Sequence, residues 1–139
     1  MTDVKAMLED LKRADIAAVK IAKVLETANL NVFAITELMS RILALCIERS
    51  ESPYKTHYQL ERMLSASRRD ARDAFELLRN QGFAVEDQPM SIALSLSLMI
   101  NRRMVMDQAG ISKEEQSAYT KKLADSFDTM IANVMRGWN

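Results

Sequence analysis

Residues 56–94 constrain the fold most, because two helical patterns there are separated by a three-residue break and followed by alternating apolar residues. The first pattern covers residues 56–64, with Thr56 as its candidate cap, and the break is Ser65-Ala66-Ser67. In the second pattern, residues 67–81, the Ser67 hydroxyl can accept a hydrogen bond from a backbone N–H and Asp70 can reach back to the start of the helix. Gly82 is suited to end it. The order predicts a helix-turn-helix.

Residues 83–100 have a strand-like pattern. Residues 83–86 are followed by Asp87-Gln88-Pro89, a turn signal, and then by apolar residues at every second position, which are Ile92, Leu94, Leu96, Leu98 and Ile100. This predicts a β-hairpin, or wing, whose second strand reaches about residue 97 and leads into a helix. Few of these residues are β-branched, so a helix that begins near Ser91 is the alternative.

Residues 3–28 predict a long amphipathic helix. One face carries apolar residues at three- and four-residue steps, namely Met7, Leu11, Ala14, Ala18, Ile21 and Leu25. A helix of about 26 residues would be about 39 Å long. A rod of that length usually needs a partner.

Residues 31–49 predict a second helix, capped by Asn31 and more apolar than the first. The apolar residues cover most of its circumference, and they are Phe33, Ile35, Leu38, Met39, Ile42, Leu43, Leu45, Cys46 and Ile47. We expect this helix in the centre of the domain, with Cys46 as an inert core thiol rather than a redox switch. Pro53 ends the pattern, since it restricts Ser52 and lacks an N–H.

The last pattern starts at residues 110–115. Ser112 is the expected cap and Glu115 occupies the third helical position. The apolar stripe that follows consists of Tyr119, Leu123, Phe127, Met130 or Ile131, and Val134. The chain is therefore expected to end as a helix.

Composition favours one domain over residues 1–139, because 48% of the residues are hydrophobic and only 3 Gly and 2 Pro are available for loops. The 19 basic and 19 acidic residues cancel, so any nucleic-acid surface must be local. Cys46 is the single cysteine and excludes an internal disulfide. The acidic N-terminal region is unlike a signal peptide, and no apolar run approaches the roughly 20 residues of a membrane span. We expect a soluble cytoplasmic protein with no membrane partner.

Basic residues gather around the predicted helix-turn-helix. Since a recognition helix contacts DNA with its N-terminal residues, Arg69 is the best candidate for a base contact. The candidate DNA-binding residues are Lys55, Thr56, Ser67, Arg68, Arg69, Arg72 and Arg79. The alternative interpretation is that Arg69 with Asp73, and Arg72 with Glu76, form i,i+4 salt bridges on a solvated helix face.

The chain resembles the MarR family of bacterial transcriptional regulators over nearly its whole length. The resemblance rests on Leu60, Leu64, Ser67, Arg68, Arg72, Leu78 and Gly82, on the 94–97 strand, and on residues 110–115 before the last helix. It implies a homodimer held by residues 1–30 and 101–139, and a winged helix-turn-helix over residues 31–100. It also implies a recognition helix in the major groove and often a small-molecule effector. The wing departs from the family, because residues 85–90 hold two acids and no base.

These observations predict a homodimeric, sequence-specific DNA-binding regulator that occupies a pseudo-palindromic operator in double-stranded DNA. The alternative is a winged-helix or helical-bundle protein-interaction adaptor that does not bind DNA, which neutral charge and an acidic wing would suit. No nucleophile motif, phosphate-binding glycine loop or metal-ligand spacing is recognisable, so we expect no enzyme activity, cofactor or metal. His57 shares a stripe with Leu60 and is expected to be partly buried and structural.

Overall fold

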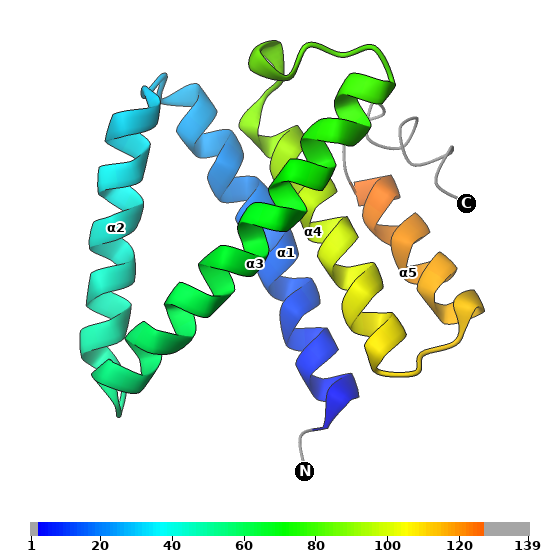
Figure 1. Cartoon of the computed structure of the whole chain (residues 1–139), viewed down its shortest axis with the longest axis horizontal. Helices are drawn as coiled ribbons and strands as arrows, with labels where there is room; N and C mark the ends of the chain where they lie inside the picture. The colour runs from blue at the N-terminus through cyan, green and yellow to red at the C-terminus, as the bar shows by residue number, and fades with distance from the viewer. Residues whose placement is uncertain (1–2, 127–139) are drawn as a thin grey trace.

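The computed structural model describes residues 3–126, and of residues 4–5 and 123–126 it describes the backbone alone. The elements are α1 (Val4–Thr27), α2 (Val32–Arg49), α3 (Pro53–Asn80), the 3-10 helix η1 (Val85–Asp87), α4 (Met90–Gln108) and α5 (Lys113–Ser126) (Figure 1). Residues 3–126 contain no β-strand, so the expectation of a mainly helical chain holds and that of a β-hairpin wing does not. None of these helices combines the length and the apolar character needed to cross a membrane. The predicted stripe positions from Phe127 onward lie outside the described residues.

Several helix ends are where the sequence predicted them. The Asn31 side chain accepts a hydrogen bond from the Ala34 backbone N–H at 2.8 Å and caps α2. The Ser112 hydroxyl accepts one from the Glu115 N–H at 3.3 Å and caps α5. Gly82 has φ +86°, a left-handed conformation that suits glycine after a helix end. Side-chain caps and left-handed glycines are local features, and for this reason they can be predicted from short stretches of sequence.

The predicted helix-turn-helix is absent, because α3 runs without a break from Pro53 to Asn80. No Gly or Pro interrupts residues 54–80, and the Ser65 hydroxyl donates to the Glu61 carbonyl one turn earlier, at 3.2 Å. Thr56 and Ser67 lie inside the helix and cap nothing. One stripe also keeps its three- and four-residue spacing across the supposed turn, through Leu60, Leu64, Ser67, Ala71, Ala74 and Leu78. An uninterrupted phase of this kind is typical of one helix.

The predicted wing is also wrong. Residues 85–87 form η1, and the segment with strand periodicity lies within α4. Ile92, Leu96 and Met99 are buried at i, i+4 and i+7, which is a helical spacing that the alternation at every second residue had concealed. The alternative of a helix that begins near Ser91 was therefore correct. Its leucine-rich, weakly β-branched composition is the physical reason.

The core lies around α4, which packs against α1, the C-terminal half of α3, and α5. We call α1, residues 67–80 of α3, α4 and α5 the bundle. The buried residues of its core cluster are Leu8, Ala74, Leu78, Ile92, Leu96, Met99, Met106 and Tyr119. The central position that the sequence predicted for residues 31–49 is thus taken by α4.

A buried ion pair joins three helices of the bundle. The Arg102 guanidinium on α4 donates from Nε and Nη2 to the two carboxylate oxygens of Asp15 on α1, at 2.9 and 2.6 Å. The Tyr119 hydroxyl on α5 donates to the same carboxylate at 3.0 Å. Burial, and then the adjacent Asp15 charge, raise the pKa of Tyr119 above its ordinary value. Because Asp15 is only 1% exposed, its two partners are what make the burial of its charge tolerable.

Two further polar contacts hold α4 against its neighbours. The Glu26 carboxylate at the end of α1 accepts a hydrogen bond from the Ser91 N–H at 2.6 Å, and so caps the start of α4, where Pro89 has no side-chain acceptor. Asn101 donates to the Asp70 carboxylate at 3.1 Å. Asp70 is therefore a buried contact between α3 and α4, and its predicted capping role is wrong.

Candidate functional site

The second helix and the start of the third stand apart from the bundle. We call residues 32–64 the arm. α1 and α2 diverge from the turn that joins them, and α2 lies at the left edge of the view, away from α4 (Figure 1). α2 packs mainly on α3, and none of its 18 residues is buried. The sequence correctly predicted an apolar helix here, but its expected place in the centre of the domain is wrong.

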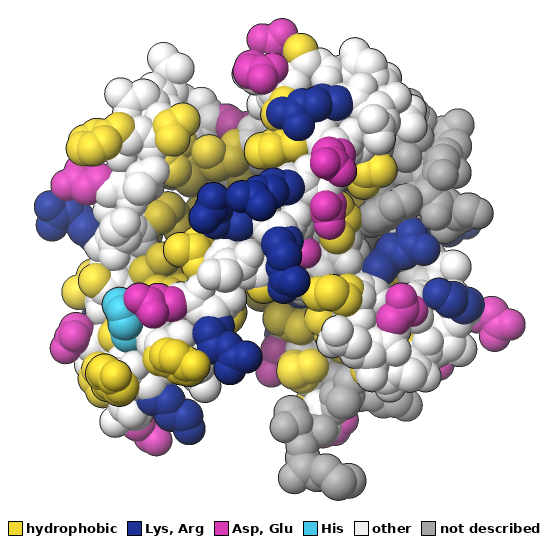
Figure 2. Space-filling model, viewed as in Figure 1, with side chains coloured by type: hydrophobic (Ala, Val, Ile, Leu, Met, Phe, Trp, Pro, Cys, Tyr) yellow, Lys and Arg dark blue, Asp and Glu magenta, His cyan; other side chains and the backbone are white. Residues whose placement is uncertain are grey.

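The arm exposes large apolar side chains that a compact domain would normally bury. Val32 is 76% exposed, Phe33 is 80% exposed and Tyr54 is 87% exposed. The full set of large apolar residues exposed on the arm is Val32, Phe33, Leu38, Ile42, Leu43, Leu45, Tyr54, Tyr58, Met63 and Leu64. Figure 2 shows hydrophobic side chains over this part of the molecule and in the space between α2 and α3. The predicted core thiol Cys46 is exposed as well.

The outward face of α2 has the geometry of a helix-packing surface. Leu38, Ile42 and Leu45 follow one another at i, i+4 and i+7, and each is exposed. On the other side of the helix, Thr36 and Ser40 bond to backbone carbonyls one turn earlier. Among the described residues, α3 covers only part of the apolar surface of α2, and this stripe stays exposed.

All the predicted DNA-binding residues lie on α3. Thr56 is half-buried, whereas the other members of the set are exposed: Lys55, Ser67, Arg68, Arg69, Arg72 and Arg79. Lys55 and Arg79 are 24 residues apart on one continuous helix, a distance of about 36 Å at about 1.5 Å per residue. Figure 2 shows Lys and Arg side chains along α3, with acidic side chains among them. The residues therefore form an extended row and do not converge on the end of a recognition helix.

In the described part of the chain, the arginines of this row form none of the i,i+4 salt bridges that the sequence would allow. Within residues 3–126, no ion pair joins Arg69 to Asp73 or Arg72 to Glu76, so the alternative salt bridges are not formed. His57, expected to be partly buried, is exposed and lies 3.3 Å from the Glu61 carboxylate.

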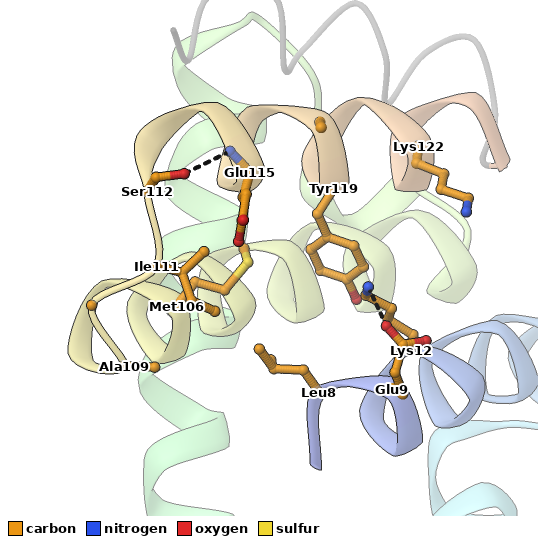
Figure 3. A pocket seen from close by; sticks show the side chains of 12 residues that line it. Leu8, Glu9, Lys12, Met106, Ala109, Ile111, Ser112, Glu115, Tyr119 and Lys122 are labelled. Carbon is orange, nitrogen blue, oxygen red and sulfur yellow. Dashed lines mark hydrogen bonds and ion pairs between the residues drawn. The ribbon is translucent and has the colours of Figure 1, made fainter. Parts of the chain in front are cut away.

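A separate cavity of about 780 Å³ lies between α1, α4 and α5 (Figure 3). Leu8, Met106, Ile111 and Tyr119 supply its apolar lining, and charged residues including Glu9, Lys12 and Glu115 lie around it. Lys12 donates to Glu9 at 2.7 Å and lies 4.9 Å above the centre of the Tyr119 ring. The hydrogen bond from Lys12 lowers the pKa of Glu9. The family resemblance implied a small-molecule effector, but the sequence did not locate this cavity, because its walls come from α1, α4, α5 and the loop that joins α4 to α5.

No protein-family model, curated protein or solved structure matches this chain. The MarR resemblance therefore receives no support from a relative, and the helix-turn-helix and wing residues on which it rested belong to other elements. Arguments about function start from the exposed surfaces of the molecule itself.

Proposed function

We propose that this protein is a non-catalytic helical interaction protein that binds another polypeptide through the apolar face of its arm. One observation carries the proposal: α2 is an 18-residue helix rich in apolar residues, and none of its residues is buried. This is the adaptor alternative that the sequence left open, without the wing.

Helix energetics support a binding role for the arm. Isolated helices shorter than about 12–15 residues are marginal in water, and longer ones in proteins owe most of their stability to the packing of an apolar face. Among the described residues α2 packs mainly on α3, while Leu38, Ile42 and Leu45 are exposed. A polypeptide laid along these residues would supply the missing half of the contact.

The partner chemistry follows from the shape of this face. A ridge of aliphatic side chains at i, i+4 and i+7 packs best into the groove of another helix. The local charges on α2 are already paired in part, since Arg41 donates to Glu37 at 2.9 Å. The expected partner surface is therefore an apolar helix face, and the binding should depend little on salt.

Site-specific cross-linking tests the proposal. A photoreactive benzoylphenylalanine replaces Leu45 in the full chain, in the cells from which the protein comes, and Ser40 on the polar side of α2 is the control position. The proposal predicts one discrete adduct from position 45, identified by mass spectrometry as a single polypeptide species. No adduct, or the same mixture of adducts from both positions, would overturn it.

The exposed row of arginines favours a second candidate, a sequence-specific DNA-binding regulator. Arg68, Arg69 and Arg72 are exposed and unpaired within residues 3–126, and a continuous helix can lie in the major groove. Fluorescence anisotropy with duplex DNA over a range of salt concentrations tests it. A DNA binder should lose affinity steeply with salt, and Arg69→Ala or Arg72→Ala should weaken it while Arg13→Ala on α1 does not. If the affinity for DNA is weak and is the same in all three variants as in the parent protein, this candidate is excluded.

A further inference from the structure

We propose that the polypeptide that covers the arm is a second copy of this chain, with α2 of each copy packed on α1 of the other about a two-fold axis. This inference rests on the proposed function, and it names the partner. It follows from a second exposed apolar stripe, on α1, that complements the stripe on α2.

The first helix has two apolar sides. One side packs in the bundle, where Val19 is 7% exposed and Ala22 is 2% exposed. Ile21 and Val24 lie roughly half a turn around the helix from this side. They are 52% and 66% exposed, and Ala17, one turn before Ile21, is exposed with them. These three residues form a second apolar stripe on α1, which the bundle leaves exposed.

The two stripes cannot satisfy each other within one chain. α1 and α2 diverge from their connecting turn (Figure 1). Both Val24 on α1 and Leu45 on α2 remain more than half exposed. The stripe on α2 consists of large residues, whereas the stripe on α1 includes alanine, so one can interlock with the other. Two copies related by a two-fold axis would form this contact twice and close the assembly.

The charges on the arm also fit a second copy. Residues 32–64 contain four acidic and four basic side chains, which are Glu37, Glu48, Glu51 and Glu61, and Arg41, Arg49, Lys55 and Arg62. A surface with no net charge does not repel its own copy, and it offers no electrostatic advantage to a strongly acidic or basic partner.

The exposed apolar area is sufficient for a stable dimer. At ~150–200 Å² for each fully exposed large side chain, the exposed fractions of the stripe residues, which are Leu38, Ile42, Leu45, Ile21 and Val24, add up to about 400–500 Å² per chain. A standard-size interface takes about 800 Å² from each partner, and a little over half of that area is apolar. The two stripes therefore supply about the apolar area that a standard dimer interface needs.

Sedimentation velocity of the purified full chain between about 1 and 100 µM tests the oligomeric state. The expected result is a dimer that Leu45→Glu dissociates, with a Kd at least ~100-fold higher, because the variant places an unpaired charge in an apolar contact. Ala44→Glu introduces the same charge next to it on the polar side and should remain dimeric. Far-UV circular dichroism of both variants checks that the helices are intact. If Leu45→Glu is unfolded, Leu45→Ala replaces it, with an expected increase in Kd of at least ~10-fold.

Disulfide cross-linking between two tagged chains tests the arrangement, in a Cys46→Ser background. One chain carries Val24→Cys, the other Leu45→Cys, and a control pair carries Val24→Cys with Ala44→Cys. Rapid oxidation of the first pair to a heterodimer, with little from the control pair, supports α2-on-α1 packing.

A chain that is monomeric at 100 µM overturns this inference, and so does a dimer in which the two glutamate variants behave alike or the 24–45 pair fails to cross-link. These failures are separable from failure of the proposed function. A monomer whose position 45 is cross-linked in cells to one different polypeptide would refute the dimer and leave the interaction function standing.

Discussion

The two halves of α3 carry the same stripe and differ completely in what covers it. In the C-terminal half, Ala74 and Leu78 are fully buried against the bundle. In the N-terminal half, on the same face, Leu64 is 61% exposed and its neighbour Met63 is 65% exposed. A regular apolar stripe thus specifies a helix and its packing face, while the burial of that face depends on which other elements reach it.

The hydrogen bonds also differ between the bundle and the arm. The bundle is tied by contacts between residues far apart in the chain, such as Arg102 with Asp15 and Asn101 with Asp70. The arm has local contacts, such as Arg41 with Glu37 one turn away. In the bundle, the residues that form tertiary hydrogen bonds are also buried, so substituting them should lower the free energy of unfolding substantially. Substituting the exposed, locally bonded residues of the arm should change it little.

Of all the predicted effects on the free energy of unfolding, the difference between bundle and arm should be largest at their ion pairs. Asp15→Ala leaves the Arg102 guanidinium buried without its partner, and should lower the free energy of unfolding by about 3–5 kcal/mol. Arg41→Ala breaks an exposed pair in the arm and should change it by less than about 0.5 kcal/mol. Urea unfolding followed by circular dichroism measures both. A cost below about 1 kcal/mol for Asp15→Ala would contradict the role of the buried pair.

Replacing one leucine in each half of α3 by alanine tests whether the apolar stripe is covered in the C-terminal half and exposed in the N-terminal half. Leu78→Ala creates a cavity in the packed core and should cost about 2–5 kcal/mol. Leu64→Ala removes the same atoms from an exposed position and should cost less than about 1 kcal/mol in the monomer. The same urea titration applies, at a protein concentration low enough to dissociate any dimer. Equal costs at the two positions would show that the N-terminal half is covered in the monomer.

A smaller effect is expected at Tyr119. Tyr119→Phe keeps the ring in place but removes the hydrogen bond to Asp15, and should cost about 1.5 kcal/mol near neutral pH. Tyr54→Phe removes an exposed hydroxyl from the arm and serves as the control. An effect of equal size in the two variants would argue against a structural role for the buried hydroxyl.

The same variant has a defined pH dependence. Folding raises the pKa of Tyr119, so the unfolded chain releases this proton first as the pH rises. The resulting stabilisation is complete below about pH 10, the ordinary tyrosine value, and decreases as the pH rises above it towards the raised pKa. The loss of stability between pH 9 and 11 should therefore be smaller in Tyr119→Phe than in the parent protein. Parallel curves for the two proteins would contradict this.

The smallest effect is expected at the arginines of α3. Arg69→Ala and Arg72→Ala remove exposed side chains that form no ion pair within residues 3–126, so the unfolding midpoint in urea should remain unchanged. Any loss of DNA affinity in these variants can then be assigned to the surface. A clear shift of the midpoint would instead indicate a structural role for this row.

Local signals in the sequence predicted the helix ends well. The caps at Asn31 and Ser112 and the left-handed Gly82 depend on a few adjacent residues, and each is where the pattern placed it. Ser65-Ala66-Ser67 resembled a turn because serine often caps helices, although serine is also tolerated within a helix when its hydroxyl bonds to a carbonyl one turn back. The unbroken spacing from Leu60 to Leu78 was the signal that could have corrected the prediction.

The candidate site was predicted only in part. The arginines of α3 were expected on the surface and are there, but a continuous helix displays them as a row. The exposure of the arm was not predicted, since the apolar residues of α2 indicated a core helix. A sequence reveals that a helix has such a face, and the side that faces solvent depends on the paths of the other helices.

The sequence by itself determined that this chain forms amphipathic helices, where several of them begin and end, and which faces are apolar, because these properties arise within a few turns of backbone. Only the tertiary structure decided that α4 occupies the centre, that Arg102 meets Asp15 across 87 positions of the chain, and that no residue of α2 is buried among the described residues. Those outcomes depend on competition among apolar faces for a limited interior, and no single segment contains the information that settles it.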